Sequence, residues 1–231
     1  MEKVVIASRL SETAKAKLRA KNVKVLDFGK NTSLNSKVAF HADMSFLVLD
    51  SKNILIANEM QDKKSILSDL GLNVITLNHS LGNIYPKDSF LNCVILEHFI
   101  ICNIDTVSPF VLQYFKDSKT IINVRQGYTK CSCVVVSDNA IITEDEGIYN
   151  ACKGKVDVLL ISKGHVHLKG FDYGFLGGAS GKIGDIIAFN GDITLHPDYD
   201  KIKDFLAKYN KKALSLCSEE LYDIGSILEV I

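Results

Sequence analysis

The sequence lacks an excess of charge of either sign, because 27 lysines and arginines are balanced by 27 aspartates and glutamates. Binding to a phosphate backbone depends on a positive field that this balance does not create, so nucleic acid is not an expected partner. The sequence also lacks an apolar run near the ~20 residues that cross a bilayer. Residues 1–10 lack the basic stretch and apolar run of a signal peptide. We therefore expect a cytoplasmic protein with no membrane partner.

The six cysteines show no CxxC spacing, which argues against a zinc ribbon and against a thioredoxin-type redox site. In a chain without an export signal they are expected to remain thiols. His165 and His167 share one face of a possible strand, and His196 with Asp198 would complete a metal set only if the fold brought them together. A surface pair of histidines is the simpler interpretation, so we predict neither a metal nor a cofactor.

The composition of the chain and the spacing of its apolar runs indicate one domain built from repeated units. Apolar residues make up 47% of the chain and charged residues 23%, as in globular proteins, and residues 1–231 fit one α/β domain. The clearest unit starts at His41 and contains strands at 46–49 and 54–57, a helix over 58–70 and a strand at 73–77. The predicted unit is therefore strand, strand, helix, strand.

Three further units follow the same order along the chain. They start near Tyr85 (strands 90–96, 99–102 and 120–124), Gln126 (strands 131–136, 141–143 and 156–161) and Phe175 (strands 185–189, 193–195 and 213–216, with no clear first strand). A fifth unit combines strands at 4–8 and 23–28 and a helix over 12–20 with a first strand from the C-terminal segment. Pairing the two termini leaves no unit uncapped, so we predict five pseudosymmetric units closed into a ring as an α/β-propeller.

Four short stretches carry a family resemblance: HAD (41–43), GYTKCS (127–132), GFLGGASGKIGD (174–185) and DIGSI (223–227). They resemble a small uncharacterised bacterial family assigned to the pentein fold. This is the five-unit fold of the guanidino-group-modifying enzymes and of the non-enzymatic translation initiation factor 6 family. The resemblance spans nearly the whole chain, and it implies a fold more than a reaction.

The resemblance also implies a central polar cavity. In the enzymatic relatives, carboxylates there hold a guanidinium, while a Cys, a His and a second acid perform covalent chemistry. Their nucleophilic Cys belongs to the start of the final unit, where this sequence has Gly225 and Ser226 and no Cys. Cys217 comes several residues too early to replace it.

Two aspartates are the first candidates for binding a cation. Asp43 and Asp88 precede strands at equivalent places in two units, so in a ring they would face one axis and share a cationic ligand, with Lys87 adjoining. The alternative is turn chemistry, because Asp is common where strands begin.

Cys131 is the candidate nucleophile. The cation of Lys130 beside it would lower the pKa of the thiol, and His41 across the axis would complete a catalytic pair. The alternative is an ordinary core strand, since period two places Cys131 and Cys133 on one face of the run CSCVVV.

The glycine-rich run 174–185 offers backbone amides to an anion, which makes Gly178, Ser180, Lys182 and Asp185 candidate ligand-binding residues. It is not a P-loop, because Leu176 and Ile183 stand where that motif needs Gly and Ser or Thr. A tight structural loop is the alternative.

The sequence therefore predicts a cavity that binds a small, guanidino-like cation without the usual Cys chemistry. One alternative is a hydrolase or transferase that uses Cys131 and His41. Another is a scaffold that binds a macromolecule through one rim.

Overall fold

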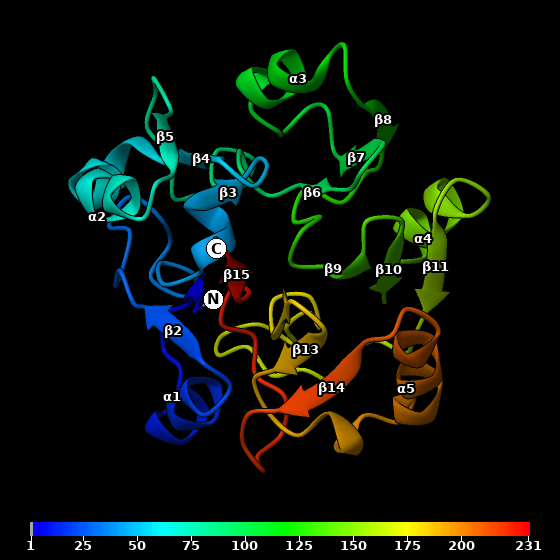
Figure 1. The fold of residues 1–231 in the computed structure, drawn as a ribbon. Coiled ribbons are helices and arrows are strands. Elements are labelled where there is room, and N and C mark those ends of the chain that lie inside the picture. The colour runs from blue at the N-terminus through cyan, green and yellow to red at the C-terminus, as the bar shows by residue number, and fades with distance from the viewer. Residues whose placement is uncertain (1) are drawn as a thin grey trace.

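A computed structural model describes residues 2–231 and contains five small sheets of three strands each. The sheets are arranged around a common centre, and the helices lie on the outside (Figure 1). The five groups are β15 (Leu228–Glu229), β1 (Lys3–Ile6), α1 (Glu12–Arg19), β2 (Val23–Leu26); β3 (Phe46–Val48), β4 (Asn53–Ile56), α2 (Lys64–Asp69), β5 (Asn73–Thr76); β6 (Val94–Ile95), β7 (Phe99–Cys102), α3 (Pro109–Phe115), β8 (Thr120–Asn123); β9 (Cys133–Ser137), β10 (Ala140–Thr143), α4 (Glu146–Cys152), β11 (Asp157–Leu160); and β12 (Ser180–Ile183), β13 (Ile186–Phe189), α5 (Tyr199–Lys208), β14 (Lys212–Ser215).

Each sheet has the same strand order and directions. The middle strand pairs antiparallel with the first strand and parallel with the strand after the helix, as Leu55 of β4 does with Leu47 of β3 and Ile75 of β5. A parallel pair needs a crossover connection, and the helix provides it. The predicted strand, strand, helix, strand unit is confirmed.

Short polar side chains cap the N-termini of three of the outer helices. Ser11 accepts a hydrogen bond from the Ala14 amide at α1, and Asp145 accepts one from the Ile148 amide at α4. Ser108 does the same for Phe110 at α3, where Pro109 occupies the first turn. These caps satisfy amides that have no partner inside the helix, so they fix where each crossover begins.

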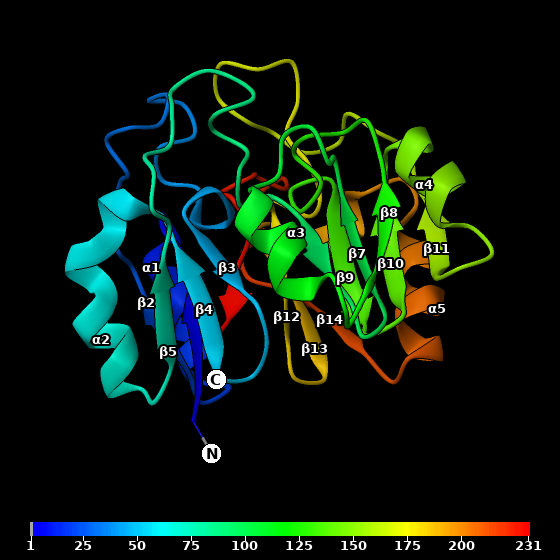
Figure 2. The same ribbon diagram turned by 90° about the horizontal axis from the view of Figure 1, so that it is seen from above.

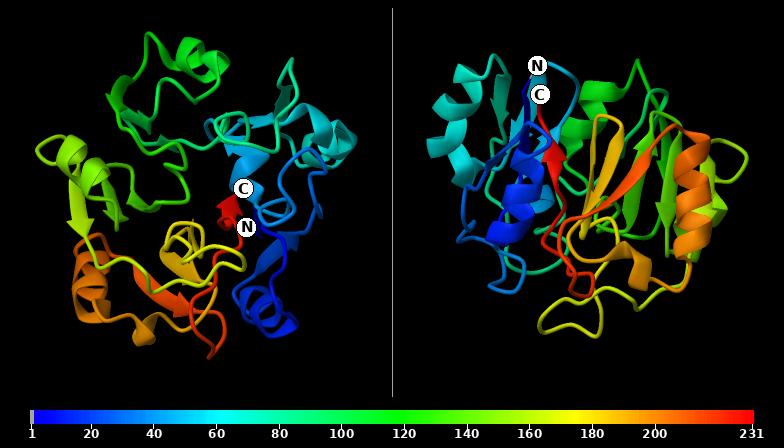
Figure 3. Two further views of the ribbon diagram at one scale, coloured as in Figure 1. Left: turned by 180° about the vertical axis from the view of Figure 1, so that it is seen from behind. Right: turned by 60° about the horizontal axis from the view of Figure 1, so that its bottom comes forward.

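The two ends of the chain pair with each other, as predicted. In β15 and β1, Glu229 lies opposite Val5 and Leu228 lies opposite Ile6. The ends lie close together in every view (Figures 1 and 3). The C-terminal segment thus supplies the first strand of the N-terminal unit.

The unit that starts near Phe175 differs from the prediction in two places. Residues 186–189 form its second strand, because its first strand is the glycine-containing β12, which precedes it. Residues 193–195 form the 3₁₀ helix η3 (Ile193–Leu195) and not a strand. The Asp192 side chain accepts a bond from the Thr194 amide there, which favours a helical turn.

The middle strands form the buried part of each unit, and Ile54, Leu55 and Ile56 of β4 are fully buried. Two 3₁₀ helices lie on either side of that hairpin, η1 (Ala42–Met44) before β3 and η2 (Asn58–Lys63) before α2. Three long loops rise on one side of the molecule, from the segments 28–40, 77–92 and 162–175 (Figure 2). Within residues 2–231, no helix combines the length and apolar character needed to span a membrane.

Candidate functional site

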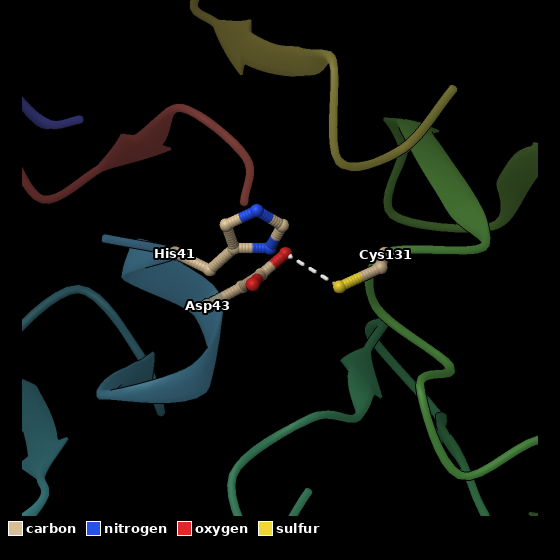
Figure 4. Close-up of side chains that lie close together, drawn as sticks. All are labelled: His41, Asp43 and Cys131. Carbon is tan, nitrogen blue, oxygen red and sulfur yellow. Dashed lines mark hydrogen bonds between the residues drawn. The ribbon is translucent and has the colours of Figure 1, made fainter. Parts of the chain in front are cut away.

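His41, Asp43 and Cys131 come from two units of the fold and lie close together (Figure 4). His41 immediately precedes η1, Asp43 lies within it, and Cys131 lies two residues before β9. All three are buried, with exposed fractions of 5% for His41, 1% for Asp43 and 3% for Cys131. They come together because each lies next to the innermost strand of its unit, where the units converge.

The thiol of Cys131 donates a hydrogen bond to Oδ2 of Asp43 at 3.1 Å. The hydroxyl of Ser226 donates to the same oxygen at 2.6 Å and accepts from Nζ of Lys130 at 3.0 Å. The other carboxylate oxygen, Oδ1 of Asp43, is buried and has no hydrogen-bond partner among residues 2–231. One carboxylate therefore joins three units of the fold and keeps one free oxygen.

Asn92 holds Cys131 in place and was missed by the sequence analysis. Its Oδ1 accepts from the amides of Lys130 at 2.7 Å and Cys131 at 3.2 Å, and its Nδ2 donates to the sulfur at 3.2 Å. The available signal was a single amide side chain within the apolar run FLNCVIL (90–96). Such a residue is buried only when it is hydrogen-bonded.

The environment of Cys131 favours the protonated thiol. Burial raises the pKa of Cys131 well above 9.0, and the charges on Asp43 and Asp223 raise it further. The ammonium of Lys130, which was expected to activate the thiol, is bonded to Ser226 instead. Lys130 and Cys131 lie in a turn before β9, and the Lys130 side chain there reaches the C-terminal segment and not the sulfur. The alternative interpretation, an ordinary core residue, applies to Cys133, which belongs to the same buried apolar cluster as Ile141. Cys131 does not belong to that cluster.

A cavity of about 490 Å³ is lined by His41, Cys131, Asp88 and Asp223. Oδ2 of Asp88 accepts a hydrogen bond from Tyr128 at 3.0 Å, while its Oδ1 is buried without a partner in the described chain. Burial raises the pKa of Asp88, and the bond from Tyr128 opposes that effect. A residue of the cavity lining thus has a buried carboxylate oxygen without a hydrogen-bond donor in the described chain.

Asp223 lines the same cavity and comes from the C-terminal segment. It accepts bonds from the amides of Phe175 and Gly225, both at 2.9 Å, and Nδ1 of His41 lies 3.8 Å from its Oδ1. Burial raises the pKa of Asp223, His41 lowers it, and the charge on Asp43 raises it. Asp223 begins the stretch DIGSI, whose resemblance implied a position facing the central cavity.

The other predicted residues do not all reach this cavity. Asp43, Ser180 and Lys182 line a second cavity of about 640 Å³, where Lys182 pairs with Asp138 at 3.4 Å. Lys87 is exposed and lines neither cavity, because its side chain packs over Gly82.

Asp185, a predicted ligand-binding residue, lines neither of these two cavities. It is exposed in the turn between β12 and β13, at the outer end of the sheet, because it precedes a second strand while Asp43 and Asp88 precede first strands.

The glycine-rich run is explained by the alternative interpretation, a tight structural loop. The amide of Gly178 donates to the carbonyl of Cys131 at 2.8 Å, so it is already used. A Cβ on Gly178 would lie 2.2 Å from Oδ1 of Asp223, a distance that no real contact shows. Glycine is required here because two segments and a carboxylate pack closely, and this explains the run without an anion.

The donor atoms of His41, Asp43 and Cys131 lie within 4.8 Å of one another and are of the types that bind Zn²⁺. A metal would have to displace the thiol proton that now bonds to Asp43. The other histidines do not form a set, since the ring of His165 faces His196 whereas His167 pairs with Glu220.

The sequence matches a family described as a family of unknown function (DUF6873) over residues 5–228. No curated protein matches it significantly. Solved structures with a similar fold include dimethylarginine dimethylaminohydrolase from Pseudomonas aeruginosa, at 8% identity and a TM-score of 0.53 over 93% of this chain and 92% of that one.

Two further structures of similar fold are those of enzymes with other names and reactions. The N-terminal domain of ArgZ, an arginine dihydrolase from cyanobacteria, is 12% identical with a TM-score of 0.57 over 100% of this chain and 98% of that one. Agmatine deiminase from C. jejuni is 12% identical with a TM-score of 0.52 over 92% and 75%. The protein therefore has the pentein fold of these enzymes, and it belongs to the family of unknown function DUF6873.

Proposed function

We propose that this protein binds a small cation of the guanidinium type in the cavity lined by Asp88 and Asp223, and that it does so without covalent chemistry at Cys131. The observation that carries the proposal is Oδ1 of Asp88. This oxygen is buried, has no partner within residues 2–231, and belongs to a cavity-lining residue. A buried carboxylate oxygen without a donor is costly, and a cationic donor would remove that cost.

The charges around the cavity favour a cation. Its lining includes the carboxylates of Asp88, Asp172 and Asp223, and no lysine or arginine of the described chain contributes to it. The aromatic rings of Tyr85 and Tyr128 also line it, 5.6 Å apart between centroids. A guanidinium placed there would gain both charge-assisted hydrogen bonds and contact with aromatic faces.

The state of Cys131 supports binding over catalysis. A nucleophile must be a thiolate, but burial and two carboxylates hold the pKa of Cys131 high, and its proton is donated to Asp43. At the start of the final unit, Ser226 stands where the resemblance places a nucleophilic Cys. Its hydroxyl is also committed to Asp43.

Isothermal titration calorimetry with agmatine tests the proposal. Wild-type protein should bind it, and Asp88→Asn should weaken binding by about tenfold or more, because a hydrogen bond to a charged group contributes about 1.5–3 kcal/mol. Asp185→Asn removes an exposed carboxylate outside the cavity and should leave the affinity unchanged. Equal loss in both variants, or no binding by the wild type, would remove the proposal.

A second candidate is hydrolysis of a guanidino compound, favoured by one observation: His41 and Cys131 line the same cavity. Water would then replace one nitrogen of the guanidinium carbon, releasing ammonia and leaving a ureido group. Ammonia release from agmatine by the wild type, absent in Cys131→Ala, would establish this candidate and overturn the non-covalent part of the proposal.

A further inference from the structure

Four large apolar or aromatic side chains lie at the mouth of the 490 Å³ cavity, beside the polar Asn35, Asn83 and Asp172. Ile84, Tyr85, Phe171 and Tyr173 line it and are 72%, 45%, 50% and 37% exposed. They belong to two of the loops that rise on the same side of the molecule (Figure 2). Large apolar side chains that are exposed together around one opening indicate a binding surface, whereas single exposed apolar residues do not. The cavity thus has the buried carboxylates of Asp88 and Asp223 in its interior and mainly apolar or aromatic side chains at its mouth.

Among residues 2–231, the same cavity has no lysine or arginine side chain that would form an ion pair with a ligand carboxylate. Asp172 adds a negative charge near the mouth. The nearest ammonium to the rings described here is that of Lys37, 5.0 Å from the centroid of Phe171. It donates to the carbonyl of Gly170 at 2.7 Å and lines a different cavity. A carboxylate entering this mouth would lose water and meet like charge.

We infer that the ligand is a guanidinium or amidinium compound that has an apolar or aromatic body and no carboxylate, as opposed to a free amino acid such as arginine. This rests on the proposed function. The charged head contacts Asp88 and Asp223, and the body lies between Tyr85 and Phe171. The assignment follows from the order of polar and apolar groups along the cavity.

Two matched pairs of ligands test the inference by calorimetry. L-Argininamide differs from L-arginine in the carboxylate alone, and it should bind about tenfold more tightly or better. Benzylguanidine differs from methylguanidine by an aromatic body and should also bind at least tenfold more tightly. Phe171→Ala should reduce that second advantage severalfold, while Phe110→Ala, which removes an exposed ring of α3, should leave it unchanged.

The outcomes separate the inference from the proposed function. If arginine binds as tightly as argininamide and Asp88→Asn weakens both, the inference is wrong while the proposed function stands. Loss of arginine binding in Lys37→Ala would then identify the group that pairs with the carboxylate. If no guanidinium compound binds, the proposed function itself has failed.

Discussion

The Cys131 thiol donates its proton toward Asp43, a residue 88 positions earlier in the chain, across 3.1 Å. The bond connects the starts of two sheets that are not consecutive in sequence, those of β3 and β9. Because the carboxylate accepts from the thiol, it stabilises the neutral sulfur and does not generate a thiolate. Cys131 is therefore held as a neutral thiol, so it is not prepared for the covalent chemistry that the resemblance to the enzymatic relatives implies.

The reactivity of Cys131 follows from this bond. Native protein should be alkylated at Cys131 by iodoacetamide more slowly than at the half-buried Cys217, because burial restricts access and the pKa is raised. Asp43→Asn removes one carboxylate charge and should speed the labelling of Cys131, whereas Asp185→Asn should not. Residue-resolved mass spectrometry from pH 5 to 9 measures both rates. Wild-type labelling of Cys131 that is faster than that of Cys217 below pH 7 would indicate a thiolate and refute this explanation.

The pH dependence of stability should reflect Glu144. Burial raises the pKa of Glu144 to about 8, although the Leu176 amide bonds to it and opposes the shift. Since the folded pKa exceeds the unfolded value of about 4.3, the stabilising contribution is complete below that value and is lost as pH rises through about 8. The free energy of unfolding should therefore fall between pH 5 and 9.

Urea unfolding of Glu144→Gln at several pH values tests this dependence. The variant should lose part of the slope and gain on the order of a few kcal/mol relative to wild type near pH 9. The raised pKa values of Asp88 and Asp223 act in the same direction, so some slope should remain. Glu146→Gln, at an exposed position of α4, is the matched control. An unchanged slope in Glu144→Gln would show that its carboxyl titrates normally.

Ser226 should matter for stability. It is fully buried, and its hydroxyl is the link between Lys130 and Asp43. Ser226→Ala should lower the free energy of unfolding by about 1–3 kcal/mol, because a buried carboxylate loses a donor. Ser137→Ala, at the half-buried end of β9, removes a hydroxyl that bonds to Asn139 and not to a buried carboxylate, so it should have little effect. Equal stability of the two variants would mean that the central network contributes little.

The C-terminal segment should be required for folding of the whole chain. Residues 221–231 include β15, which pairs with β1, and the buried Ile224 and Ile227. Deleting 221–231 should therefore abolish cooperative thermal unfolding, followed by circular dichroism. A truncated chain that melts cooperatively near the parent temperature would contradict the role of terminal pairing.

The units could be predicted from sequence because their strands are continuous apolar runs. The predicted strands at 46–49, 54–57 and 73–77 match β3, β4 and β5 within a residue at each boundary. The strand β12, with sequence SGKI, was missed because it lacks an apolar run and contains a glycine. Without that strand, the position of Asp185 in the hairpin turn between β12 and β13 could not be foreseen.

The site was harder to predict than the fold. His41 and Cys131 could be placed at one centre because they stand at equivalent points of repeated units. Asn92 could not be singled out, because its function depends on bonds to residues 38 and 39 positions away. The sequence gives no measure of such distant contacts, nor of which carboxylate oxygen remains unpaired.

The position of a bound guanidinium tests the central claim most directly. A crystal structure of the protein with agmatine should show guanidinium nitrogens about 2.7–2.9 Å from the Asp88 carboxylate, the distance typical of charge-assisted hydrogen bonds. It should also show the thiol of Cys131 unmodified and still bonded to Asp43. Agmatine bound elsewhere while Asp88 remains unpaired, or a covalent bond between Cys131 and the guanidinium carbon, would contradict it.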